Sequence, residues 1–122
     1  MRRILLVEDE DILRETYQLV LSTQPYILNI AENGQQALDY CAKNTYDLIL
    51  LDLMMPVLDG VGFLKKFMPT APKTTRVVIL SNLSSGVELE ASRKFGVDRN
   101  LVKASMSPKQ LLAAVRYELE AI

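Results

Sequence analysis

The sequence predicts an α/β fold built on a parallel sheet, and two observations lead to this prediction. Short apolar runs alternate with amphipathic helical patterns five times along the chain. Four of the runs are uninterrupted, as expected for parallel strands that are covered on both faces. The predicted strands are Ile4–Val7, Tyr26–Ala31, Leu48–Leu51, Val77–Leu80 and Leu101–Val102. Asn29 interrupts the second run, which therefore predicts a strand nearer an edge of the sheet.

Five helices are predicted between and after these strands. The first begins near Asp11, and the second is capped near Asn33, with Gln36 placed to complete a capping box. The last helix has Ser107 as its cap and Pro108 at its first position. The predicted apolar faces are Leu13, Tyr17, Val20 and Leu21; Ala37, Leu38, Cys41 and Ala42; Val61, Leu64, Phe67 and Met68; Val87, Ala91 and Phe95, ended by Gly96; and Leu111, Leu112, Val115 and Leu119. Pro69–Thr75 is predicted to be a loop.

The length predicts one domain over residues 1–122, and because the last predicted helix runs almost to Ile122 we expect no output domain in this chain. Its 14 basic and 15 acidic residues give a formal net charge of −1, which argues against direct nucleic acid binding and against a membrane-binding patch. The N-terminal apolar run is too short for a signal peptide or a membrane span. The single cysteine, Cys41, suits a reducing compartment, so we expect a cytoplasmic protein. There are no histidines, so any divalent ion must be held by oxygen.

Polar side chains follow four of the five predicted strands. Glu8 and Asp9 end the first run, Asp52 the third, Ser81 the fourth and Lys103 the fifth. Because the carboxyl ends of parallel strands share one edge of the sheet, we expect these groups to converge there. The result would be two or three carboxylates, a hydroxyl and an ammonium in one place.

Asp52 is the most informative of these residues. It follows four apolar residues, and a lone carboxylate there is costly to ionise unless a cation or hydrogen-bond donors meet it. Mg²⁺ accepts one or two carboxylates together with a phosphate. Lys103 offers a compact positive charge to a phosphoryl oxygen, and Ser81 a hydrogen bond. Each residue alone has an ordinary structural explanation, such as a helix cap, a turn or a solvated lysine, but the combination predicts a site.

The chain resembles the receiver domains of bacterial two-component response regulators. The matching segments are residues 4–10 (ILLVEDE), 47–60 (DLILLDLMMPVLDG), 79–81 (ILS), Gly96 and 101–103 (LVK). The resemblance covers the whole chain and implies a doubly wound (βα)5 fold, a three-layer sandwich. Its five-stranded parallel sheet has the order 2-1-3-4-5, as in CheY-like and flavodoxin-like proteins.

The resemblance also implies an aspartyl-phosphate site. Asp52 corresponds to the phosphoacceptor and to a ligand of Mg²⁺, for which Mn²⁺ can substitute. Asp9 corresponds to a direct metal ligand and Glu8 to a ligand through water. The backbone carbonyl of Met54 corresponds to the third protein ligand.

Further roles follow from the same resemblance. Lys103 corresponds to the phosphate partner and Ser81 to the switch hydroxyl, while Pro56 and Gly60 shape the loop after the phosphoacceptor. The implied phosphodonor is a sensor histidine kinase or a histidine phosphotransfer protein, and a downstream partner, not identified by the sequence, reads the switch. We expect a signalling domain that promotes its own phosphorylation and dephosphorylation, not an enzyme acting on a separate substrate. Residues Arg99 and Arg116 suggest a homodimer through the last helices.

The chain departs from the family pattern at several positions. Asn100 stands where the family usually has Tyr or Phe, and Ala104 where it usually has Pro. The aromatic coupling behind the switch hydroxyl and the shape of the turn after Lys103 are therefore open. Met54 and Leu83 are apolar and flank the expected path of an attacking water, which predicts slow self-dephosphorylation.

Three other functions share part of this pattern. A haloacid-dehalogenase-like phosphatase also uses a strand-end aspartate and Mg²⁺, but it normally has a second aspartate where this chain has Met54. A degenerate receiver that serves only as an interaction module would not need the full set of site residues. A flavodoxin-like electron carrier lacks support, because no phosphate-cradling loop follows the first strand.

Overall fold

A computed structural model gives the fold, and it describes residues 1–82 and 86–120. Five parallel strands form one sheet in the order β2-β1-β3-β4-β5. The strands are β1 (Arg3–Val7), β2 (Ile27–Ala31), β3 (Leu48–Asp52), β4 (Arg76–Ser81) and β5 (Asn100–Val102). The predicted fold class and strand order are thus confirmed, and β2 lies at an edge, as the interruption by Asn29 predicted.

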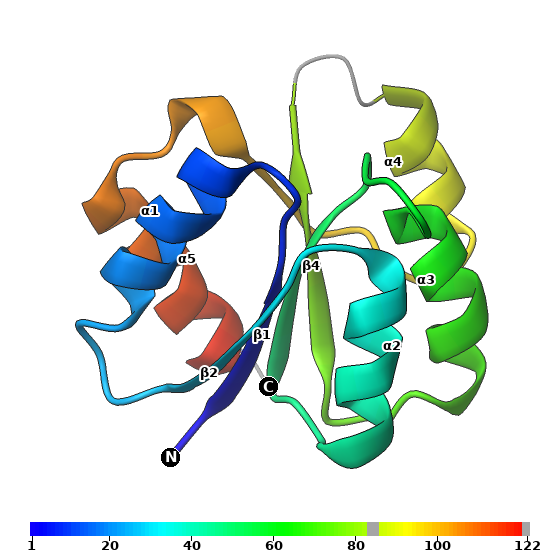
Figure 1. The fold of residues 1–122 in the computed structure, drawn as a ribbon, viewed down its shortest axis with the longest axis horizontal. Coiled ribbons are helices and arrows are strands. Elements are labelled where there is room, and N and C mark those ends of the chain that lie inside the picture. The colour runs from blue at the N-terminus through cyan, green and yellow to red at the C-terminus, as the bar shows by residue number, and fades with distance from the viewer. Residues whose placement is uncertain (83–85, 121–122) are drawn as a thin grey trace.

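Helices cover both faces of the sheet and complete three layers. They are α1 (Asp11–Leu21), α2 (Gly34–Lys43), α3 (Gly60–Phe67), α4 (Gly86–Arg93) and α5 (Pro108–Glu120). Figure 1 shows α1 and α5 on one side and α2, α3 and α4 on the other. No helix in the described ranges is long and apolar enough to span a membrane.

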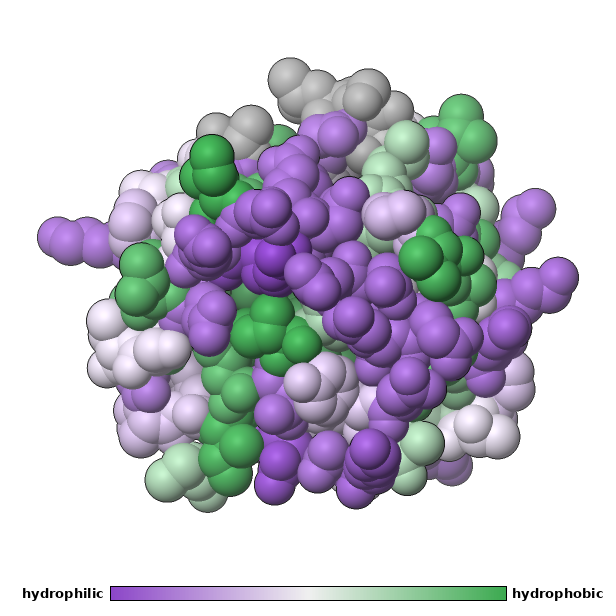
Figure 2. Space-filling view, in the orientation of Figure 1, coloured by the Kyte–Doolittle hydropathy of each residue, from purple (hydrophilic) through white to green (hydrophobic). Residues whose placement is uncertain are grey.

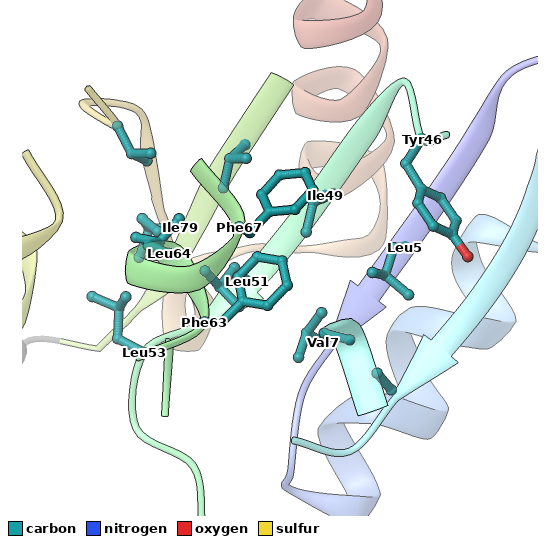
Figure 3. Packing of buried hydrophobic residues seen from close by; sticks show 14 residues of the cluster. Leu5, Val7, Tyr46, Ile49, Leu51, Leu53, Phe63, Leu64, Phe67 and Ile79 are labelled. Carbon is teal, nitrogen blue, oxygen red and sulfur yellow. The ribbon is translucent and has the colours of Figure 1, made fainter. Parts of the chain in front are cut away.

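The apolar core lies on both sides of the sheet. All five residues of β3 are buried, which fits its place at the centre. On the side of α2 and α3, Phe63 and Phe67 stack with ring centroids 5.1 Å apart and pack toward Ile49 and Leu51 (Figure 3). Side chains of β1, β3 and β4 with the opposite orientation pack against α1 and α5. β1 and β3 are therefore held by packing on both faces of the sheet, and the residues at their ends have fixed positions.

The predicted caps account for two helix starts. The Asn33 side chain accepts a hydrogen bond from the backbone N–H of Gln36 at 2.9 Å, while the Gln36 side chain reaches back to Glu32 rather than to Asn33. Ser107 and Gln110 bond reciprocally at 3.2 and 2.7 Å, a complete capping box.

Two short 3₁₀ helices were not predicted. Met68–Thr70 continues the end of α3 into the segment predicted as a loop, and Lys103–Ser105 follows β5. Beyond α4 the chain turns at Gly96, whose φ of +81° suits glycine. On the face drawn in Figure 2, hydrophobic atoms form separate groups between hydrophilic ones.

Candidate functional site

An acidic pocket lies at the carboxyl edge of the sheet. Asp52 ends β3 and Glu8 follows β1, and the two strands pair through Val7 and Leu51. Glu8 is fully buried, Asp52 is 2 % exposed, and Asp9 is half-buried. One carboxylate oxygen from each of the three lies within 4.8 Å of the others. The three carboxylates therefore converge, as expected from the sequence.

Lys103 supplies the positive charge of this pocket. It is 8 % exposed, and its Nζ lies 3.0 and 3.3 Å from the two carboxylate oxygens of Glu8 and 3.3 Å from Oδ1 of Asp52. Burial lowers the pKa of the Lys103 ammonium, but the hydrogen bond to Glu8 and the charge of Asp52 outweigh this, so the net shift is upward. The direct pairing with Glu8 was not anticipated from the sequence.

The two oxygens of Asp52 have different surroundings. Oδ1 accepts a hydrogen bond from the backbone N–H of Met54 at 3.2 Å, besides its contact with Lys103. Oδ2 is buried and has no hydrogen-bond partner among the described residues. Burial, with the neighbouring Asp9 and Glu8, raises the pKa of Asp52 to about 8, against the lowering effect of Lys103.

This arrangement suits a hard divalent cation. Three carboxylates face one ammonium, so the pocket holds excess negative charge, and Oδ2 of Asp52 finds no hydrogen-bond partner in the described part of the chain. Mg²⁺ prefers such oxygen ligands. The residues present therefore fit the predicted metal, while the carbonyl of Met54 as a further ligand stays a prediction.

Ser81 ends β4 and is 2 % exposed, but its hydroxyl faces β5. Its Oγ donates to the carbonyl oxygen of Leu101 at 3.3 Å and accepts from the side-chain amide of Asn100 at 3.3 Å. The strand pairing of Asp52 with Leu80 puts Ser81 one residue further along the neighbouring strand. Its role as a switch hydroxyl stays a prediction, and Asn100 is now seen to contact it directly.

The loop after Asp52 is tightly folded. A Cβ on Gly60 would lie 2.6 Å from the backbone oxygen of Asp52, so only glycine allows this approach. The carbonyl of Pro56 accepts from the N–H of Leu58 at 2.8 Å, closing a γ-turn around Val57, whose φ is +68°. Gly60 and Pro56 thus both take part in the close contacts of this loop, and their role in shaping the site stays a prediction.

A surface hollow adjoins the pocket beside this loop. Its lining includes Asp9, Met54, Asp59 and Glu88, and Met54 is 52 % exposed. Met54 therefore lines a hollow next to Asp9, and its effect on an attacking water stays a prediction. Leu83, the other residue predicted to flank the path of water, lies outside the described residues.

Two contacts to the site were missed by the sequence analysis. Arg14 donates from Nη1 to the backbone carbonyls of Glu8 and Asp9, each at 3.1 Å, and its Nη2 pairs with Asp11 and Glu32. The sequence did contain an indication of this contact, because Arg14 lies one helical turn after the acidic residues that follow β1.

The second missed contact comes from Tyr17, which was assigned only to the apolar face of its helix. Its hydroxyl donates to the backbone carbonyl of Lys103 at 3.1 Å, and both residues are buried. Burial and the nearby Glu8 raise the pKa of Tyr17 to about 12, so the phenol is protonated at neutral pH.

Comparison with known proteins gives a consistent result. A family model described as response regulator receiver domain matches residues 4–116. The response regulator ArlR of Staphylococcus saprophyticus is 34 % identical over 116 residues, which are 95 % of this chain and 51 % of that protein. Protein RcaC of Microchaete diplosiphon is 35 % identical over 118 residues, 93 % of this chain and 17 % of that protein. The chain thus spans about half of the first of these relatives and less than a fifth of the second.

Solved structures with the same fold cover nearly the whole chain. The chemotaxis response regulator CheY4 of Vibrio cholerae superimposes with a TM-score of 0.85 at 28 % identity, covering 97 % of this chain and 98 % of that one. The receiver domain of the Francisella response regulator 1452 gives a TM-score of 0.82 at 28 % identity, covering 99 % and 98 %.

Proposed function

The chain belongs to the response regulator receiver domains of two-component systems, and on this premise we propose that it accepts a phosphoryl group on Asp52 in an Mg²⁺-dependent reaction. One observation carries the proposal. Oδ2 of Asp52 has no hydrogen-bond partner among the described residues, and it lies in a pocket that also holds an ammonium and two further carboxylates. A bound Mg²⁺ would balance the charge of the carboxylates, and phosphoryl oxygens would accept hydrogen bonds from the ammonium of Lys103.

Asp9, Asp52 and Glu8 are the side chains that would hold the metal, with the carbonyl of Met54 as a backbone ligand. When bound, Mg²⁺ supplies charge neutralisation for the acidic cluster and for phosphoryl oxygens. Arg14 holds the backbone of Glu8 and Asp9 from behind, so these two carboxylates start from a fixed position.

Phosphoryl transfer then follows from the roles of the side chains. Oδ2 of Asp52 attacks the phosphorus of a phosphohistidine, the P–O bond forms, and the P–N bond breaks with its electrons going to the imidazole nitrogen. Lys103 keeps one carboxylate contact and turns an N–H toward a phosphoryl oxygen. Because Oγ of Ser81 donates to Leu101, it must leave that carbonyl before it can donate to the phosphoryl group.

The donor we propose is a sensor histidine kinase or a histidine phosphotransfer protein, since this chain has no histidine of its own. The outcome is a shift between two conformations that a partner distinguishes, and not the turnover of a separate substrate. Met54 takes the position of the second aspartate expected in a haloacid-dehalogenase-like phosphatase, which favours the switch over the enzyme. The complete set of Asp9, Asp52, Ser81 and Lys103 likewise favours it over a degenerate interaction module.

Dimerisation through the last helices stays a prediction. Arg99 on that side already pairs with the buried Glu118, with Nη2 2.5 Å from Oε2, and its guanidinium lies 5.2 Å from the ring centre of Tyr117. Any dimer contact of Arg99 must therefore accommodate this pairing.

The test is phosphorylation of the purified chain. Acetyl phosphate with Mg²⁺ should add the mass of one phosphoryl group, and EDTA or the change Asp52→Asn should abolish the addition. The exposed Asp39 provides a matched control, because Asp39→Asn should phosphorylate like the wild type. Phosphorylation that persists in Asp52→Asn, or steady hydrolysis of phosphate esters by the wild type, would overturn the proposal.

A further inference from the structure

Lys103 lies just beyond the end of the sheet. The ladder between β4 and β5 ends with the pair Ser81 and Val102, so Lys103 is the first residue without a strand partner. A single 3₁₀ turn, Lys103–Ser105, follows, and the hydroxyl of Ser105 donates to the carbonyl of Val102 at 3.2 Å. Residue 104 is an alanine, so no proline ring stiffens this turn.

The backbone of Lys103 is instead held from α1. Tyr17 is 3 % exposed and belongs to the apolar cluster between the sheet and α1 and α5. Its hydroxyl, at the tip of this fixed ring, donates to the Lys103 carbonyl at 3.1 Å. We propose that Tyr17 is a positioning residue, whose phenol fixes the backbone of Lys103 so that its ammonium meets the phosphoryl group on Asp52. This inference rests on the proposed function of Asp52.

The other contacts of Lys103 cannot do this alone. Its Nζ reaches Glu8 and Asp52 over four flexible carbons, and these are the contacts that change when Asp52 carries a phosphoryl group. The bond from Tyr17 involves the backbone carbonyl, so the chemistry at Asp52 leaves it unchanged. This hydrogen bond therefore holds the backbone of Lys103 in one position while its side chain changes partners in the pocket.

Removal of this hydroxyl has a direct physical consequence. In Tyr17→Phe the ring still fills its place in the core, but a buried carbonyl loses its donor and the turn after β5 gains freedom. The lysine must then be ordered when the phosphoryl group binds, and that ordering weakens binding.

The experiment compares two buried tyrosines. Tyr46 is 2 % exposed, and its hydroxyl donates to Asn29 at 2.7 Å, on residues outside the acidic pocket. Beryllofluoride with Mg²⁺ serves as the phosphoryl analogue, and Mg²⁺ alone reports on the carboxylates. We expect Tyr17→Phe to weaken beryllofluoride binding by about 3- to 10-fold, the size expected for one buried hydrogen bond. Binding of Mg²⁺ alone, and both measurements in Tyr46→Phe, should change less than about twofold.

A double-mutant cycle with Lys103→Met tests whether Tyr17 acts through the lysine. In that background Tyr17→Phe should have no further effect on beryllofluoride binding. An unchanged affinity in Tyr17→Phe, an equal loss in Tyr46→Phe, or a full effect that persists without Lys103 would each refute the role of Tyr17. Wild-type protein that does not bind beryllofluoride at all would instead refute the proposed function, and this inference with it.

Discussion

Asp52→Asn should make the metal-free protein more stable, although it removes the proposed phosphoacceptor. The change keeps the shape of the side chain and, at a pH where Asp52 is ionised, removes one of three clustered negative charges. Lys103 keeps its partner, because Glu8 holds the ammonium at 3.0 and 3.3 Å. The new amide can also donate toward the neighbouring carboxylates, where Oδ2 of Asp52 has no partner within the described chain.

The magnitude follows from burial and from the pKa. A buried polar atom without a hydrogen bond costs about 1–3 kcal/mol. The pKa of Asp52 is raised to about 8 in the folded state, against 3.8 for an unperturbed aspartate. The folded protein therefore keeps a proton that the unfolded chain has lost, so the stability of the wild type falls as the pH rises from about 4 to about 8. We expect Asp52→Asn to gain about 1–3 kcal/mol at pH 8 and much less at pH 4.5.

Urea denaturation in EDTA at several pH values measures this difference. Asp39→Asn is the control, because Asp39 is exposed and its substitution should change the free energy of unfolding by less than about 0.5 kcal/mol at any pH. If Asp52→Asn is no more stable than the wild type, or if its advantage shrinks as the pH rises, the electrostatic account of the pocket is wrong.

Four further predictions concern the same region. Mg²⁺ at ten times its dissociation constant should stabilise the wild type by about 1.4 kcal/mol and Asp52→Asn by clearly less, as measured by thermal unfolding. Arg14→Met should weaken Mg²⁺ binding in calorimetry by about 3- to 10-fold, because two carbonyls lose their shared donor. Val57→Gly should raise the free energy of unfolding by about 0.5–2 kcal/mol, since glycine adopts a φ of +68° without strain; a destabilised variant would mean that the γ-turn is not strained. The phosphoryl group on Asp52 should persist for many minutes in the purified protein, because the apolar Met54 flanks the path of an attacking water. Met54→Asn should shorten this lifetime. Decay of the wild-type phosphoryl group within a minute would show that Met54 does not slow hydrolysis.

The sequence predicted the fold well because the fold depends on local patterns. Buried parallel strands are continuous apolar runs, and their limits were predicted to within about one residue. The caps at Asn33 and Ser107 marked helix starts for the same local reason. The 3₁₀ turn at Met68–Thr70 was missed because proline, here Pro69, is also common in irregular loops.

The composition of the pocket was predicted, but the pairing within it was not. Strand order brings Glu8, Asp52 and Lys103 to one edge, yet which carboxylate holds the ammonium depends on side-chain geometry that no sequence pattern encodes. Tyr17 shows the same difficulty in another form. Its spacing correctly indicated a core-facing position on α1, but an apolar face does not reveal where a hydroxyl at its tip finds an acceptor.

The contacts of Ser81 indicate how this chain differs from the usual receiver pattern. Asn100 stands where the family has an aromatic ring, and its side-chain amide donates to Oγ of Ser81. The Ser81 hydroxyl in turn donates its one proton to the carbonyl of Leu101. Movement of Ser81 toward a phosphoryl group would break both bonds and free an exposed amide on β5. We therefore expect the change at Asp52 to reach the surface through hydrogen bonds. An aromatic side chain at this position would instead change its burial. A partner that recognises this domain would therefore have to bind the polar amide of Asn100.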